Sequence, residues 1–269
     1  MVIDRSERSC LLCNKQFVGR TFLCRECSDR YRGQDVPFEI RQRFYQELDF
    51  EYPDRSNTYD VYNRPEALLE AIMRLPRHVA ILEVGAGGGF LLQELHNAGF
   101  SDLTGSDITE SAVLEMSRRI PEADLVLADA ARLSFQPETF DIVISSDVVE
   151  HLPDVEEHFE SVATILKPRG LYFIKTPNRL VAEAYYRLRG LHDSYFWHPW
   201  MFTAPELSGA LERYGFEMRM LRPSRLTEAQ MVKLPGGKLL RPIADRLPVE
   251  YIPAAVRPHL EVVARKSAS

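Results

Sequence analysis

The stretch from Val79 to Gly99 limits the possible folds more than any other part of the chain. It consists of a short apolar run, VAILEV, then a glycine-rich turn, GAGGG, and then an amphipathic segment over 90–99. Such an apolar run is typical of a buried parallel strand, and glycines in the following turn let the backbone approach a ligand closely. The stretch therefore predicts a strand, a ligand-binding loop and a helix, in that order.

Short apolar runs and amphipathic segments keep alternating after this unit. Strands are predicted over 102–107, 124–128, 140–146 and 170–175, and helices over 110–120 and 155–166. This alternation is typical of a parallel sheet with helices on both faces. Two last strands, over 216–221 and 259–265, are expected to close the sheet as an antiparallel pair. The predicted fold class is α/β, with a doubly wound, seven-stranded, Rossmann-like sheet.

The spacing of the glycines and acids discriminates between nucleotide cofactors. The dinucleotide fingerprint needs glycine at the sixth position of GxGxxG, and counting from Gly85 that position is Phe90. The second strand ends at Asp107, where a carboxylate is placed to accept hydrogen bonds from both hydroxyls of a ribose. A nucleoside cofactor is predicted. The alternative is an ordinary tight turn, with Asp107 and Asp129 capping helices.

Taken together, these motifs resemble those of class I S-adenosylmethionine-dependent methyltransferases over about residues 79–178. The matching pieces are EVGAGGG, Asp107, the Asp129-Ala130 pair, FDIVISSDVVEHLPD and LKPRGLYFIKTPN. The resemblance implies that the glycine loop lies against the methionine part of the cofactor, that Asp107 binds the ribose and that Asp129 reaches the adenine. The implied cofactor-binding residues are Glu83, Gly85, Ala86, Gly87, Gly89, Asp107, Ile108, Asp129, Ala130 and Ser146.

A cluster of polar residues follows the fourth predicted strand. Asp147, Glu150 and His151 form D-x-x-E-H, which resembles the E-x-x-E-H of quinone-biosynthesis O-methyltransferases and of a group of small-RNA 2′-O-methyltransferases, where these residues hold a divalent cation. A hydroxyl acceptor needs alignment and loss of a proton. The predicted catalytic residues are His151, Asp147 and His198. A cation at Asp147, Glu150 and His151 is the less favoured interpretation, because so short a motif also occurs as a helix cap.

An aromatic insertion over 179–202 follows the fifth predicted strand. Seven of the 18 residues over 185–202 are aromatic, and both tryptophans of the chain lie here. Substrates bind at the carboxyl edge of such sheets, so we expect a lid over the methyl acceptor. The alternative is an aromatic surface loop in which the histidines only make hydrogen bonds, and for His192 this alternative is favoured.

All four cysteines lie within the first 27 residues, as two C-x2-C pairs separated by ten residues. This spacing predicts a closed, four-thiolate zinc site at Cys10, Cys13, Cys24 and Cys27. Because no coordination position stays open, the zinc is expected to be structural. Two disulfides, or a redox pair, are less favoured in a reducing compartment.

The predicted organisation has three parts: a zinc-knuckle module over 1–33, a helical connector over 34–78 and a methyltransferase domain over 79–269. The connector includes helices near 37–48 and 65–73, the second with Pro65 in its first turn and Asn63 as a cap. A proline-rich insertion over 223–258 extends the acceptor pocket, touches a membrane surface or packs as a solvated edge segment.

The predicted activity is methyl transfer from S-adenosylmethionine to a hydroxyl oxygen of a small or lipid-like molecule. One alternative is nucleobase methylation of RNA, because some ribosomal RNA guanine methyltransferases also carry a four-ligand zinc module. The net charge of −6, from 33 basic and 39 acidic residues, argues against a dedicated nucleic-acid binder. Another alternative is a cofactor-binding scaffold without turnover. The sequence contains neither a signal peptide nor a membrane-spanning run, so a cytoplasmic location is expected.

Overall fold

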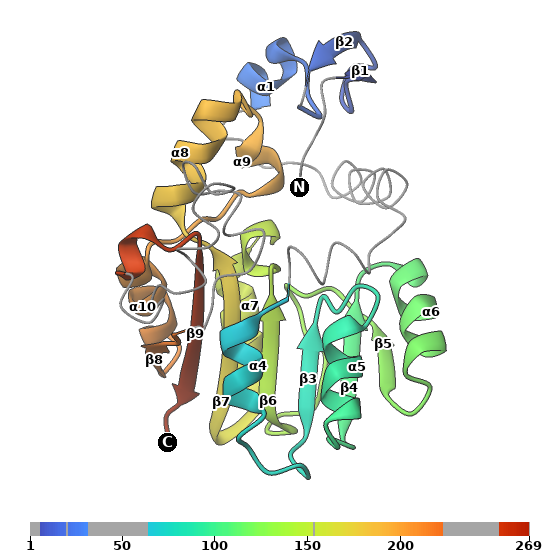
Figure 1. Cartoon of the computed structure of the whole chain (residues 1–269), viewed down its shortest axis with the longest axis vertical. Coiled ribbons are helices and arrows are strands. Elements are labelled where there is room, and N and C mark those ends of the chain that lie inside the picture. Colours follow the sequence, from blue (N-terminus) through green and yellow to red (C-terminus); the bar gives the residue numbers. More distant parts are fainter. Residues whose placement is uncertain (1–5, 20, 32–63, 153, 223–252, 269) are drawn as a thin grey trace, which may run out of the picture.

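The computed structural model describes residues 6–19, 21–31, 64–152, 154–222 and 253–268. They form a seven-stranded sheet with helices packed on it and a small two-stranded module near the amino terminus (Figure 1). The strand order is β5-β4-β3-β6-β7-β9-β8. The strands are β3 (Ile81–Val84), β4 (Leu103–Asp107), β5 (Asp124–Leu127), β6 (Phe140–Ser146), β7 (Leu166–Pro177), β8 (Phe216–Met220) and β9 (His259–Lys266).

The predicted sheet is confirmed. Neighbouring strands from β5 to β7 pair in parallel, whereas β9 runs antiparallel to both β7 and β8. The order turns back at β3, since β4 lies on one side of it and β6 on the other. Ligands of doubly wound sheets bind at such a switch point, outside the carboxyl ends of the strands. The predicted cofactor loop begins at the carboxyl end of β3.

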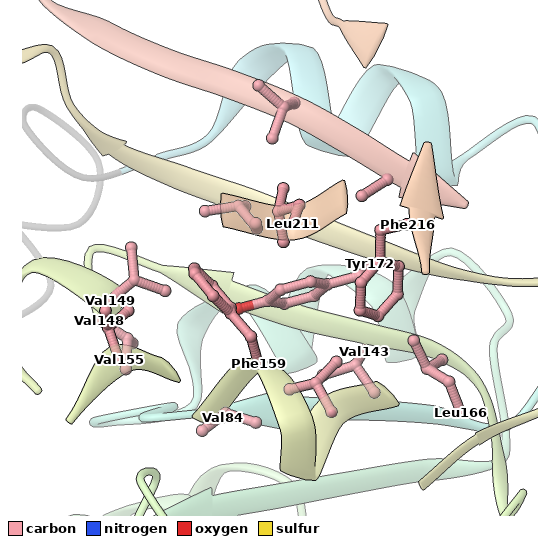
Figure 2. Close-up of a cluster of buried hydrophobic side chains, with 14 of the residues drawn as sticks. Val84, Val143, Val148, Val149, Val155, Phe159, Leu166, Tyr172, Leu211 and Phe216 are labelled. Carbon is pink, nitrogen blue, oxygen red and sulfur yellow. The ribbon is translucent and has the colours of Figure 1, made fainter. Parts of the chain in front are cut away.

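Two apolar clusters cover the two faces of the sheet. Successive residues of a strand point to opposite faces, and on β3 Ile81 belongs to one cluster and Leu82 to the other. The first face is covered by α4 (Glu66–Ile72), α5 (Phe90–Asn97) and α6 (Glu110–Arg119), and the second by α7 (Val155–Ile165) and α10 (Ala204–Glu212). Figure 2 shows the second cluster, in which Phe159 of α7 and Tyr172 of β7 lie beside Leu211 and Phe216.

Helix α4 is capped from a distant strand. The sequence suggested Pro65 in the first turn and Asn63 as the cap, but the helix begins at Glu66 and Pro65 occupies the capping position. The Glu261 carboxylate of β9 accepts the backbone N–H groups of Ala67 and Leu68, at 2.9 and 3.1 Å. A negative charge is favourable at a helix amino terminus, so the Glu261 carboxylate holds the start of α4 against β9.

A buried histidine supports the loop that carries Asp129. His158 of α7 donates from Nδ1 to the carbonyl of Ala130 at 2.5 Å, and its Nε2 faces the hydroxyls of Tyr172 at 2.7 Å and Ser145 at 3.3 Å. The side chain has no exposed surface. Burial lowers the pKa of His158 to about 4, so the ring is neutral in the folded protein at neutral pH.

We expect His158 to make the protein less stable in mild acid. The unfolded histidine takes up a proton below a pKa of about 6.5, whereas the folded one does so only near 4, so this contribution to stability is lost as the pH falls between these values. The free energy of unfolding of wild type should therefore fall by about 2 kcal/mol more than that of His158→Gln between pH 7.5 and pH 5. Urea unfolding followed by circular dichroism measures the difference, and equal falls would contradict it.

The amino-terminal module contains β1 (Ser6–Ser9), β2 (Gln16–Gly19) and α1 (Arg25–Tyr31). The aromatic insertion folds as α8 (Arg179–Arg189) and α9 (Ser194–Trp197). The predicted helix near 37–48 and most of the proline-rich insertion lie outside the described residues, so the proposed division into three parts stays a prediction. Among the helices that are described, none combines the length and apolar character needed to cross a membrane.

Candidate active site

The loop after β3 has a backbone that requires glycine. Gly85 and Gly87 have positive φ angles of 63° and 54°, which side-chain-bearing residues rarely adopt. A Cβ at Gly85 would lie 2.7 Å from Cγ2 of Val148, so space as well as conformation excludes a larger residue there. Gly89, with φ of 75°, then caps α5. The loop is therefore a tight turn, with Gly85 and Gly87 partly exposed at the predicted cofactor site.

Asp107 ties this loop to the next strand. One carboxylate oxygen accepts the N–H of Gly87 at 2.9 Å, and the other accepts the N–H and hydroxyl of Thr109, each at 3.0 Å. The carbonyl of Asp107 accepts the N–H of Ala128 at 2.9 Å, which brings the segment leading to Asp129 alongside. Asp129 in turn accepts the N–H of Ala131 at 2.9 Å. The predicted ribose and adenine contacts therefore lie at the ends of neighbouring strands.

Glu83 lies beneath the glycine loop with one oxygen unused. Only 5% of the residue is exposed, and among the described residues its Oε2 has no hydrogen-bond partner. Burial, reinforced by the charge of Asp107, raises the pKa of Glu83 to about 8. A buried carboxylate oxygen without a partner is unfavourable, and a ligand that brings a hydrogen-bond donor or a positive charge would satisfy it. The carboxylate acceptors of Glu83, Asp107 and Asp129 fit a positively charged ligand that donates from hydroxyl and amino groups.

The remaining predicted cofactor residues lie at the same edge of the sheet, where the parallel strands end. The N–H of Ala86 bonds to the carbonyl of Ser106 at 2.9 Å, and the carbonyl of Ala130 is held by His158. Ile108, which follows β4 directly, is 37% exposed, as expected for a side chain that a bound nucleoside would cover. Ser146 is the last residue of β6 and is half-buried.

The predicted catalytic residues form a second group, after β6. Asp147 has a positive φ of 56° and forms an ion pair with the buried Lys175 of β7. Glu150 is buried, and its Oε2 accepts the hydroxyl of Thr176 at 2.9 Å. Burial, together with the nearby charge of Asp147, raises the pKa of Glu150 to about 8. Asp147 is thus paired with a lysine rather than with either predicted histidine.

The two histidines face one another at this position. Their ring centroids are 4.6 Å apart. His151 donates from Nδ1 to the carbonyl of Trp197 at 2.6 Å, so its Nε2 carries the lone pair, and burial lowers the pKa of His151. Nδ1 of His198 lies 2.8 Å from the hydroxyl of Tyr186. One ligand atom from each of Glu150, His151 and His198 lies within 4.8 Å of the others, which is close enough to share a cation.

Several residues of this region were not singled out from the sequence. Lys175, Thr176, Tyr186 and Trp197 all contact the predicted catalytic group. One feature of the sequence could have identified Lys175. A lysine at the end of an apolar strand predicts an acidic partner, because an unpaired buried charge is unfavourable. The others depend on the fold of the insertion, which the sequence pattern did not specify.

The four cysteines converge in the amino-terminal module. Their sulfur atoms lie within 4.8 Å of one another, and Cys13 and Cys24 are 3.8 Å apart. Four thiolates around zinc, with Zn–S bonds of about 2.3 Å, place neighbouring sulfurs about 3.8 Å apart. The arrangement fits a tetrahedral metal.

Comparison with known proteins agrees with this geometry. A family model described as "Methyltransferase domain" matches residues 59–221. The chain is 29% identical over 198 residues to a ubiquinone biosynthesis O-methyltransferase of Chelativorans sp., covering 68% of this chain and 73% of that protein. A protein of the same name from Rhizobium leguminosarum is 32% identical over 123 residues, or 44% of this chain and 48% of that one.

Solved structures show the same fold. An S-adenosylmethionine-dependent methyltransferase from Mesorhizobium loti matches with a TM-score of 0.54 at 21% identity, over 74% of this chain and 98% of that one. A 1,6-didemethyltoxoflavin-N1-methyltransferase from Burkholderia thailandensis, solved with S-adenosylhomocysteine, matches with a TM-score of 0.54 at 17% identity, over 86% of this chain and 91% of that one. The chain belongs to the methyltransferase-domain family and is an S-adenosylmethionine-dependent methyltransferase of class I.

Proposed function

We propose that the protein transfers a methyl group from S-adenosylmethionine to a hydroxyl oxygen of a small or lipid-like aromatic molecule. The observation that carries this proposal is the state of His151. Because the Nδ1–H of His151 donates to the carbonyl of Trp197, a proton removed from a hydroxyl acceptor would be taken up at Nε2. The ubiquinone biosynthesis O-methyltransferases among the relatives support the same acceptor chemistry.

In this proposal the chain's own residues orient the cofactor. Asp107 accepts from the ribose hydroxyls, Asp129 from the adenine amino group, and Glu83 with the glycine loop supports the methionine end. When bound, the cofactor supplies a methyl carbon activated by a positively charged sulfur. The transfer is an in-line displacement, so alignment of the acceptor oxygen is the main contribution of the protein.

The charges of the site favour a neutral or weakly charged acceptor. Among the residues that the structure describes, five acids lie at this edge of the sheet, and Lys175 is paired with one of them, Asp147. These acids are Glu83, Asp107, Asp129, Asp147 and Glu150. Phosphates bind through unpaired Lys and Arg side chains, so the arrangement argues against RNA. The insertion contributes the half-buried Tyr186 and Trp200, which is 37% exposed, and both suit an aromatic ring.

A labelling experiment tests the proposal. The protein is incubated with S-adenosylmethionine carrying a ¹³C methyl group, and with metabolite extract, total RNA or 3,4-dihydroxybenzoate in separate reactions. Products are identified by mass spectrometry and by the ¹³C shift of the methyl group. We expect an O-methyl product from the metabolites or from the catechol probe. Label found only in RNA, or on nitrogen or carbon, would contradict the proposal.

Removal of divalent cations distinguishes two ways in which the acceptor hydroxyl could lose its proton, to a general base or with the help of a bound cation. Proton transfer to His151 alone predicts that O-methylation survives in buffer freed of Mg²⁺ and Mn²⁺ by a chelating resin, with the zinc content of the protein checked to be unchanged. A cation shared by Glu150, His151 and His198 would instead lower the pKa of the acceptor hydroxyl directly, and activity would then return on addition of Mg²⁺ or Mn²⁺. We propose the first mode, because Thr176 and Tyr186 already engage the Glu150 and His198 side chains.

We propose further that Cys10, Cys13, Cys24 and Cys27 bind one structural zinc ion. Double replacement of Cys10 and Cys13 by Ser should release about one zinc per chain, because two ligands cannot hold the metal at neutral pH, and metal binding stabilises the folded module. Metal analysis by plasma mass spectrometry checks this, with Ser9→Ala as a matched control. Unchanged zinc content in the double variant would exclude the four-cysteine site.

A further inference from the structure

The amino-terminal module is joined to the aromatic insertion by a buried interface. Cys10, Cys24 and Cys27 share an apolar cluster with Leu191, Phe196 and Trp197. In Figure 1, α9 lies between the module and the sheet. The four-cysteine site and the predicted acceptor lid are therefore neighbours through α9, although more than 160 residues separate Cys27 from Asp193 in the sequence.

Asp193 is the polar centre of this interface. Its Oδ2 accepts the backbone N–H groups of Phe22 at 2.7 Å and Leu23 at 3.1 Å, and its Oδ1 lies 3.5 Å from the indole nitrogen of Trp197. The residue has no exposed surface and directly precedes α9. A buried carboxylate without such donors is strongly unfavourable, so the conformation of α9 depends on how residues 22 and 23 are held.

The proposed metal site fixes those same residues. Phe22 and Leu23 immediately precede Cys24, and the hydroxyl of Thr21 bonds to the carbonyl of Leu23 at 2.9 Å. A second connection runs through Ser28, which follows Cys27: its hydroxyl donates to the carbonyl of His192 at 3.2 Å, and its carbonyl accepts the hydroxyl of Tyr195. The residues on both sides of the second C-x2-C pair, Cys24 and Cys27, thus hydrogen-bond to the segment 192–195.

On its other side, α9 holds the predicted catalytic histidines. The carbonyl of Trp197 accepts Nδ1–H of His151, and the Trp197 ring packs on His198 with centroids 4.5 Å apart. The carbonyl of Trp197 selects the tautomer of His151, because only the form protonated at Nδ1 can donate to it. A displacement of α9 would therefore release both rings.

We infer that the four-cysteine module is the support of the acceptor lid: its metal fixes Asp193 and α9, and α9 fixes the orientation and tautomer of His151. Asp193 is then a positioning residue. This inference rests on the proposed function only for the role of His151, and its test does not require a known acceptor.

The test uses the full-length chain with Trp200→Phe, which leaves Trp197 as its single tryptophan. Trp197 is 7% exposed in the docked state. Removing zinc with a chelator should shift its fluorescence to longer wavelength, and adding zinc should restore the original spectrum. ¹⁵N-histidine spectra, assigned with His151→Gln, should show a fixed Nδ1–H tautomer with zinc and averaged nitrogen shifts without it. The affinity for S-adenosylhomocysteine should change by less than about twofold, because among the described residues no hydrogen bond or ion pair joins Asp107 or the glycine loop to the module.

Variants of Asp193 test the connection without removing the metal. Asp193→Ala should reproduce both spectroscopic changes, and any loss of zinc affinity in this variant is the reciprocal effect that coupling requires. Asp193→Asn keeps an oxygen for the two N–H groups and should restore the wild-type spectra. Leu188→Ser, at a side chain that is 87% exposed on α8, is the matched control and should change neither.

The inference is overturned if the zinc-free protein retains the Trp197 emission and the His151 tautomer, or if Asp193→Ala keeps zinc and both spectra unchanged. Failure of wild type to methylate any hydroxyl acceptor would instead overturn the proposed function. The two failures are distinguishable, because the spectra are recorded without an acceptor.

Discussion

Asp107→Ala should weaken the binding of S-adenosylmethionine by at least about 100-fold, since hydrogen bonds to a charged group contribute about 1.5–3 kcal/mol each and about 1.4 kcal/mol corresponds to a factor of ten. The variant loses the acceptor proposed for both ribose hydroxyls. It also loses the bonds that hold Gly87 and Thr109, at 2.9 and 3.0 Å. Equilibrium dialysis with radiolabelled cofactor measures the effect.

Two further variants distinguish the loss of a cofactor contact from disruption of the fold. Asp102→Ala removes an exposed acid that directly precedes β4, at the opposite end of the strand from Asp107, and should bind the cofactor as wild type does. Asp107→Asn keeps an oxygen for Gly87 but loses the charge, and its affinity should lie between those of wild type and Asp107→Ala. Wild-type affinity in Asp107→Ala would show that the cofactor lies elsewhere.

His151→Gln should lower kcat by about 10²–10⁴-fold, the usual contribution of a general base. Because His151 lies in the acceptor group and Asp107 in the cofactor group, the affinity for S-adenosylmethionine should stay within about twofold of wild type. His78→Gln changes an exposed histidine three residues before β3, at the opposite end of this strand from the glycine loop, and serves as the matched control. Steady-state kinetics with the acceptor identified by labelling measures both parameters.

The dependence of the methylation rate on pH tests the role of His151 as a base in a second way. A base must be unprotonated, so the rate should rise with pH, and burial places the midpoint below the ordinary histidine pKa of about 6.5. This limb should be absent in His151→Gln. If kcat and the limb both persist in the variant, His151 does not accept the proton.

The sheet was predictable because its signals are local. The glycine loop, the acids at strand ends and the alternation of apolar runs are each read from neighbouring residues, and the structure confirms the sheet and its closing antiparallel pair. Some lengths differ. β7 begins at Leu166 and ends at Pro177, because pairing with β6 and β9 extends it beyond the apolar run over 170–175.

The support of the site was not predictable, because it consists of contacts between distant residues. Asp193 contacts Phe22 across 171 positions, and Glu261 contacts Ala67 across 194. In the sequence, each acid looks like an ordinary polar residue of a loop or strand. The partner of Asp147 illustrates the same point: the sequence did not indicate one, but the pairing of β6 with β7 sets Lys175 beside it.

The most direct measurement is a calorimetric titration of the wild-type chain with S-adenosylhomocysteine, at two temperatures so that a small enthalpy at one of them does not hide binding. The proposed cofactor site at the glycine loop and Asp107 predicts saturable binding of one ligand per chain, lost in Asp107→Ala. A folded wild-type chain that gives no saturable heat at either temperature would contradict the assignment of the glycine loop and Asp107 as the cofactor site.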